Sequence, residues 1–89
     1  MITPTIHMNG TSGRDLAEGY ANAYRAVDAA IEAVAKAGPN GRDYYPQGPE
    51  AMTQAVEEHR ARLESLRQIH RELQELCIYC MDNDTRKGG

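Results

Sequence analysis

Apolar residues recur at alternating spacings of four and three along two long stretches of this 89-residue chain. The repeating positions, which include two histidines, are Leu16, Tyr20, Ala23, Val27, Ala30, Val34 and Ala37 in the first stretch, and Met52, Val56, His59, Leu63, Leu66, His70, Leu73, Cys77 and Cys80 in the second. A seven-residue repeat of this kind keeps one side of a helix apolar along its whole length. The pattern therefore predicts two long amphipathic helices, over residues 13–37 and 49–82.

Turn-forming residues mark the ends of both predicted helices. Ser12, with Asp15 three residues later, is typical of a helix N-terminus. The Gly-Pro pair at residues 38–39 ends the first helix and the pair at residues 48–49 begins the second, since glycine and proline favour these positions. Residues 38–48 are therefore expected to form a connecting loop.

The two ends of the chain differ from the helices between them. Ile2, Ile6 and Met8 alternate with polar residues, which indicates an extended arm over residues 1–12. Residues 83–89 are mostly polar, and we expect a disordered tail there. The sequence thus predicts a single all-α domain, an antiparallel two-helix hairpin with a short extended N-terminal arm.

The unequal helix lengths predict self-association. About 25 residues in the first helix and about 34 in the second span roughly 37 and 51 Å. If the helices start side by side at the loop, the C-terminal end of the second projects past the first by roughly 14 Å. The projection carries Leu73, Leu76, Cys77, Ile78, Tyr79 and Cys80, and we expect the N-terminal arm and a second copy to cover it together. We therefore expect a symmetric dimer or larger oligomer whose interface contains Leu73, Leu76, Cys77 and Cys80.

Composition and charge argue against several classes of partner. The chain contains no Trp and no Phe, so its own core is expected to be small. A net charge of −3 disfavours direct binding to nucleic acid, which needs a basic face. No apolar run approaches the ~20 residues that cross a bilayer, and the N-terminal residues do not follow the signal-peptide pattern. The two cysteines are expected to be reduced thiols, and the cytoplasm is the expected compartment.

The connecting loop holds the densest group of side chains suited to binding. Its five polar-headed residues are Arg42, Asp43, Tyr44, Tyr45 and Gln47. A tyrosine face can stack on a nucleobase, and arginine can donate two parallel hydrogen bonds to phosphate. The sequence thus predicts a ligand site here. The alternative is that the two tyrosines close the end of the hairpin while Arg42 and Asp43 cap helix ends. Adjacent residues of an extended loop point apart, so we expect one tyrosine to face outward.

Two histidines lie within the apolar repeat of the second helix. His59 and His70 are roughly 16 Å apart along the helix axis and cannot share a metal within one chain. One interpretation is a pair of buried neutral imidazoles, each with a hydrogen-bond partner, which Tyr20 or Tyr24 could supply to His70. The other is that these histidines pair with those of a second copy across a symmetry axis.

Cys77 and Cys80 form a C-x-x-C pair near the end of the second helix. A zinc site typically needs four ligands, and a redox pair normally lies at a helix N-terminus, so neither chemistry fits. Buried unreactive thiols are the expectation, with a metal shared between chains and His70 as the alternative. No nucleophile, base and orienting acid form a recognisable set, and the glycines match no phosphate-binding loop. We therefore expect no enzyme activity, no metal and no cofactor.

The segment Asn40-Gly-Arg-Asp-Tyr-Tyr-Pro-Gln-Gly-Pro-Glu-Ala51, with a predicted helix on each side, resembles small uncharacterised proteins encoded by phages and prophages. This resemblance covers most of the chain, from about residue 10 to about residue 76. A looser similarity, of architecture alone, is to phage anti-defence proteins. Some of these are small helical-hairpin oligomers that sequester cyclic nucleotide signals at subunit interfaces, and others block CRISPR complexes.

The cluster of Arg, Tyr and Gln side chains on the bend of an otherwise plain scaffold favours a non-enzymatic, phage-type binding protein. We expect it to sequester a small anionic, nucleotide-like ligand in an inter-subunit pocket near residues 40–48. In this interpretation Arg42 contacts phosphate, and Tyr44 or Tyr45 stacks on a base. One alternative is an inhibitor or adaptor that binds a host defence protein through its helix surface. Another is a structural or assembly component of the virion.

Overall fold

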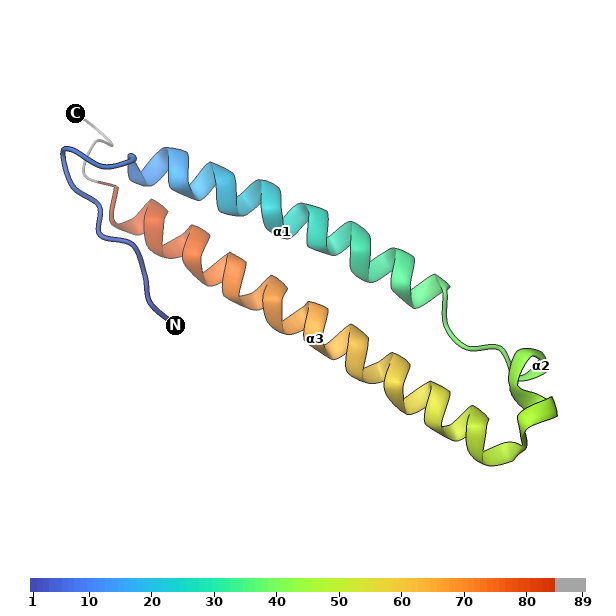
Figure 1. The fold of residues 1–89 in the computed structure, drawn as a ribbon. Coiled ribbons are helices and arrows are strands. Elements are labelled where there is room, and N and C mark those ends of the chain that lie inside the picture. The colour runs from blue at the N-terminus through green and yellow to red at the C-terminus, as the bar shows by residue number, and fades with distance from the viewer. Residues whose placement is uncertain (85–89) are drawn as a thin grey trace.

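The computed structural model describes residues 1–84, and every regular element in this range is a helix. Helix α1 spans Gly13–Lys36, the short helix α2 spans Gly41–Tyr44, a 3-10 turn spans Tyr45–Gln47, and helix α3 spans Pro49–Asp82. Figure 1 shows α1 and α3 side by side and running in opposite directions, with α2 at the bend. The prediction of an all-α fold is confirmed for the described residues.

One end of each long helix has a side-chain cap. The Ser12 Oγ accepts a hydrogen bond of 3.0 Å from the backbone N–H of Asp15, as the sequence predicts. At the other end, the Asn83 side-chain amide donates a hydrogen bond of 2.9 Å to the carbonyl of Tyr79 and closes the last turn of α3. Of the predicted disordered tail at 83–89, residues 85–89 lie outside the described residues.

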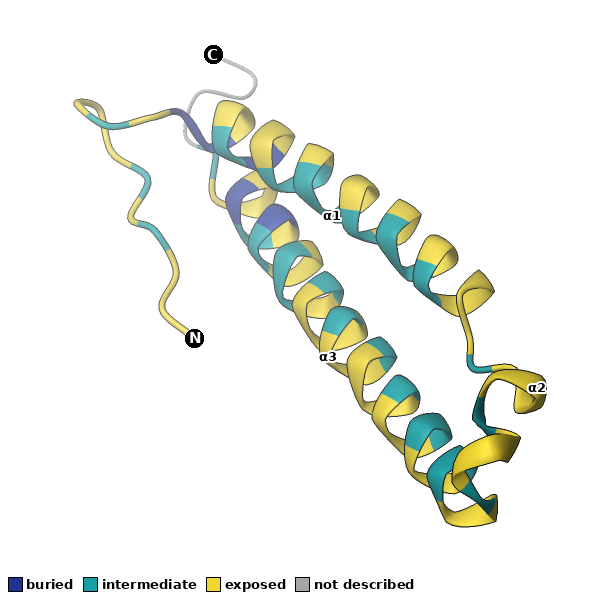
Figure 2. Cartoon of the chain, turned by 45° about the vertical axis from the view of Figure 1, so that its right-hand side comes forward, coloured by how far each residue is buried: buried dark blue, intermediate teal, exposed yellow. Residues whose placement is uncertain are grey.

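The apolar repeat lies where α1 and α3 face each other. Every predicted position of the repeat is buried or half-buried except Ala37, which is exposed beyond the end of α1. Figure 2 shows the half-buried residues along the facing sides of the two helices, and the fully buried ones gathered near the chain ends. The buried apolar residues are Ala17, Cys77 and Cys80. We call the facing sides of α1 and α3 the seam. Because two helices cover each other on this one side only, most seam residues keep partial contact with solvent.

The axial alignment of the two helices differs from the predicted one. A Cβ atom added at Gly13 would lie 2.5 Å from the carbonyl oxygen of Cys80, so α1 begins level with the end of α3. The excess length of α3 therefore lies at the bend, beside α2 (Figure 1). The expected projection of the C-terminal end of α3 past α1 is wrong, because the helical turns between Lys36 and Pro49 span the extra length instead.

The core at the chain ends is covered by the start of α1 and by one residue of the N-terminal arm. Ile6 packs against the buried cluster, together with Leu16 and Tyr20 of α1. Ile2 and Met8 on the same arm are exposed. The arm is without regular secondary structure in the described residues, and its contribution to the core comes from Ile6.

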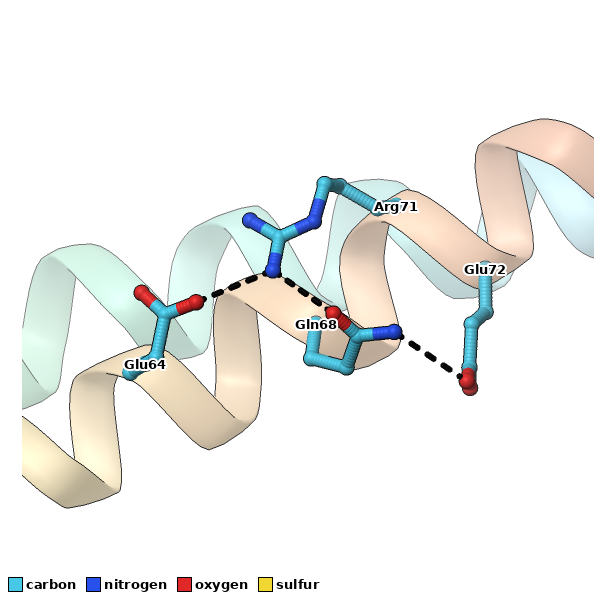
Figure 3. Close-up of polar contacts among 4 residues, drawn as sticks. All are labelled: Glu64, Gln68, Arg71 and Glu72. Atoms are coloured by element: carbon cyan, nitrogen blue, oxygen red, sulfur yellow. Dashed lines mark hydrogen bonds and ion pairs between the residues drawn. The ribbon is translucent and has the colours of Figure 1, made fainter.

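The outward side of α3 carries a chain of polar contacts (Figure 3). An amino nitrogen of Arg71 lies 2.9 Å from a Glu64 carboxylate oxygen and donates a 2.7 Å hydrogen bond to the Gln68 carbonyl oxygen. The Gln68 amide in turn donates to Glu72 at 3.4 Å. Exposed pairs of this kind contribute at most ~1 kcal/mol each. This side of the helix is therefore a solvated surface that does little to hold the fold together.

Gly48 is the residue at which the backbone needs glycine. Its φ of 100° and ψ of 163° are confined almost entirely to glycine, and it caps the N-terminus of α3 without a side-chain hydrogen bond. We expect Gly48→Ala to lower the free energy of unfolding by about 1–2 kcal/mol, as measured by urea denaturation followed by circular dichroism. Gly41→Ala is the control, since a Cβ there meets open space. Equal stability of the two variants would contradict the prediction.

Candidate functional site

The connection between α1 and α3 is folded into helical turns. The Asn40 side-chain oxygen accepts a 3.0 Å hydrogen bond from the backbone N–H of Arg42 and begins α2. The backbone N–H of Gly48 then bonds to the carbonyl of Tyr45 at 3.1 Å and closes the 3-10 turn. Asparagine is a favoured N-cap residue, so the local sequence accounts for this turn. The predicted loop is therefore helical rather than extended.

A recess of about 290 Å³ lies under this bend, between the end of α1 and the N-terminal half of α3. Ala37, Ala51 and Ala55 contribute small walls. The residues with polar heads around it are Tyr44, Gln47, Gln54, Glu58, His59 and Arg62. The recess exists because α3 extends past the end of α1 at this end of the molecule, which leaves its first turns facing the bend instead of a helix.

The structure separates the five predicted site residues into two groups. Tyr44 and Gln47 line the recess, whereas Arg42, Asp43 and Tyr45 do not. Tyr45 is 75 % exposed and Tyr44 is half-buried, so one tyrosine faces outward, as expected. Successive residues of a helical turn point about 100° apart, which is why the five do not share one side.

Residues of α3 supply polar groups that the loop sequence does not contain. Arg62 and Glu58 face each other at 4.0 Å, and the Gln54 amide donates a 3.2 Å hydrogen bond to the other Glu58 carboxylate oxygen. Both members of the ion pair are largely exposed, and a pair at this distance in water contributes little. The Arg62 guanidinium therefore keeps donors available for a ligand. Arg62, and not Arg42, is the arginine that lines the recess.

His59 places a buried, unpartnered polar atom beside the recess. Its Nε2 is buried without a hydrogen-bond partner within the described part of the chain. A Cβ at Gly38 would lie 3.6 Å from the same atom, so small residues at the end of α1 leave room next to it. An unsatisfied buried polar group costs about 1–3 kcal/mol, and a group entering the recess could remove that cost. The sequence predicts His59 as a seam residue, which it is, but does not show its role in a recess.

His70 lies in a different environment near the middle of the seam. Its Nε2 is 2.9 Å from a carboxylate oxygen of Asp28 on α1, although the ring is not aligned for a hydrogen bond. The Tyr24 ring packs edge-on against the imidazole, with 5.4 Å between ring centres. Tyr24 is thus a neighbour of His70, as the sequence suggests, but it contacts the imidazole through its ring. The nearest polar contact comes from Asp28, which the apolar repeat did not indicate.

The two cysteines belong to the core. The Cys77 thiol donates a 3.3 Å hydrogen bond to the carbonyl of Ala17, and Cys80 is 0 % exposed. Burial raises the pKa of the Cys80 thiol, and the neighbouring Cys77 adds to this in the same direction. Within residues 1–84, no group of three or more His, Cys, Asp or Glu side chains is placed to hold a metal ion.

The predicted oligomer interface is affected by this packing. A single chain already buries Cys77 and Cys80 against α1. They were predicted to lie in the interface because they were expected to be uncovered in one chain, and they are not. Leu73 and Leu76 are half-buried. Their contact with a second copy stays a prediction.

No protein-family model, curated protein or solved structure matches the chain. Among the described residues, no helix has the length and apolar character needed to cross a bilayer.

Proposed function

We propose that this protein is a non-enzymatic binding protein that acts as a symmetric oligomer and holds a small nucleotide-like ligand in the recess at the bend. The observation that supports this is the convergence of an aromatic ring, amides, a guanidinium and a histidine side chain on one recess. Its volume of about 290 Å³ is close to the lower end for small-molecule sites, roughly 300 Å³. A mononucleotide-sized group fits that scale.

Each lining residue has a role in this proposal. The Tyr44 ring stacks on the base, which contributes about 1–3 kcal/mol in single-stranded nucleic-acid complexes. Arg62 binds the phosphate, in place of the predicted Arg42. His59 and Gln47 hydrogen-bond to the polar edge of the base or to the sugar. The Glu58 carboxylate repels an anion. The phosphate is therefore placed at the Arg62 guanidinium, and the polar edge of the base lies near the Glu58 carboxylate.

The resemblance of residues 40–51 to phage proteins suggests where such a ligand would come from. A phage protein that sequesters a nucleotide needs no catalytic residues, because removal of the free signal is sufficient for its effect. Cyclic dinucleotides, cyclic trinucleotides and ADP-ribose derivatives combine a base with phosphate. They are therefore the ligand classes to test first.

We expect Tyr44→Ala to weaken binding of such a ligand by about 10- to 100-fold, because stacking is lost. Isothermal titration calorimetry with a panel of these nucleotides measures the effect. Tyr45→Ala is the matched control, since its ring is exposed and does not line the recess. No heat with any member of the panel would end the proposal for those ligands. Equal losses of affinity in the two variants would show that the ligand does not bind in the recess.

A protein-binding inhibitor or adaptor is the second candidate. It is favoured by the exposed apolar side chains of the arm, since Ile2 is 93 % and Met8 is 87 % exposed. An apolar arm of this kind suits a groove on a host defence protein or a virion component. Charge reversal at Arg71, on the outward side of α3, would then weaken binding to the partner protein more than Tyr45→Ala does.

A further inference from the structure

One side of α1 carries alanine at nearly every position. Ala23, Ala26, Ala30, Ala33 and Ala37 recur at spacings of three and four, which places them on one side of the helix. Ala26, Ala33 and Ala37 are exposed, and Ala23 and Ala30 are half-buried at the edge of the seam. Small residues at this spacing allow another helix to approach closely.

The same face of the molecule continues onto α3. The recess joins Ala37 at the end of the alanine row to Ala55 and Arg62 of α3, so these residues share one face. Ile69 follows Arg62 after seven residues, or two helical turns, and so lies on the same side of α3. Ile69 is 45 % exposed. We call this surface, made of the five alanines and Ile69, the alanine face.

The chain exposes more surface than a compact monomer of its mass, which leaves enough area for a partner. A folded monomer of this mass is expected to expose about 5,200 Å². The chain exposes 6494 Å², an excess of roughly 1,300 Å² over that expectation. One partner in a stable protein–protein interface buries about 800 Å². The excess accompanies a rod of 64 × 21 × 16 Å, which is the shape of half a four-helix bundle.

We propose that a second copy of this chain packs on the alanine face through its own alanine face, so that the two hairpins form a four-helix bundle. A two-fold axis makes such an interface self-complementary. The alanine face borders the recess at Ala37 and Arg62, so the second copy lies beside the recess and supplies a wall to it. This deepens the proposed function, and its ligand part rests on that function. The interface itself forms without a ligand.

The first test is the mass of the ligand-free protein by light scattering between about 5 and 100 µM. We expect twice the 9.9 kDa of one chain. Ala33→Arg is expected to weaken the dimer at least 10-fold, because the new side chain fills the close contact. Ala35→Arg is the matched control. It is also exposed, and two residues along a helix turn it to the opposite side.

A second pair of variants tests the α3 part of the face. Ile69→Arg is expected to weaken the dimer at least 10-fold, whereas Ile78→Arg leaves it unchanged. Ile78 is 58 % exposed and lies nine residues from Ile69, which is half a turn around the helix. Both positions are exposed in the single chain, so the variants retain its fold. Far-UV circular dichroism checks that helix content is unchanged.

The outcomes separate the interface from the ligand site. A single-chain mass at about 100 µM would overturn the proposal. So would equal effects of the two members of each pair, or weakening by Ala35→Arg and Ile78→Arg alone, which would place the contact on the opposite face. A dimer that depends on Ala33 and Ile69 but binds no nucleotide would support the interface while ending the proposed function.

Discussion

Replacement of Gly13 by alanine is expected to lower the free energy of unfolding by about 3 kcal/mol. The added methyl group would lie 2.5 Å from the carbonyl oxygen of Cys80 and 2.8 Å from the Cα and Cβ atoms of Asp84. Two of these atoms are backbone atoms, one in the last turns of α3 and one just after its end, so relief requires this segment and α1 to move apart. That movement opens the small buried core at this end. Urea denaturation at a fixed protein concentration, followed at 222 nm, measures the loss.

Gly19→Ala is the control for this prediction. Gly19 lies in the same helix, and a Cβ there meets no atom within 4 Å. Alanine is the better helix former, so the control is expected to gain about 0.5–1 kcal/mol. If both variants gained stability, the close approach of α1 to the end of α3 would be absent in solution. The axial alignment of the helices would then need revision.

The spacing of apolar residues predicts which sides of the helices meet but not how far one is shifted along the other. Sliding two helices by seven residues leaves a seven-residue repeat in place, so Leu63 or His70 could face either of two turns of α1. The alignment is instead determined where small residues permit contact, at Gly13 and Ala17 beside the two cysteines. Close contacts of this kind depend on three-dimensional packing, and the spacing of apolar residues does not predict them.

The candidate site shows the same division between what spacing predicts and what packing decides. Tyr44 and Gln47 could be predicted as site residues because they lie in the bend between two helices. Arg62 and His59 could not be assigned there, because their role depends on α3 projecting past α1 at the bend. The short helix α2 had a signal in the sequence. Asn40 with Asp43 three residues later is the same arrangement that correctly predicted the start of α1 at Ser12.

Cys80 is expected to react with iodoacetamide at least about 100-fold more slowly in the native protein than in the unfolded one near pH 8. Its side chain is fully covered, and its thiol must lose a proton before it can attack the reagent. Burial raises the pKa of this thiol, with a further contribution from Cys77, so the reactive thiolate is scarce in the native state. Labelling therefore requires opening of the core, and a 100-fold protection corresponds to about 2.7 kcal/mol for that opening.

This protection is expected to shrink at alkaline pH. Below the pKa of the unfolded thiol both states hold the proton, and the contribution of Cys80 to stability is fully present. As the pH rises towards the raised pKa of the native thiol, the unfolded state releases its proton first, so opening becomes easier by at most about 1.4 kcal/mol per pH unit. An Ala61→Cys variant supplies an exposed thiol on α3, which should be labelled at the unfolded rate throughout. Labelling of Cys80 as fast as of that control near pH 8 would show that α1 does not cover the end of α3.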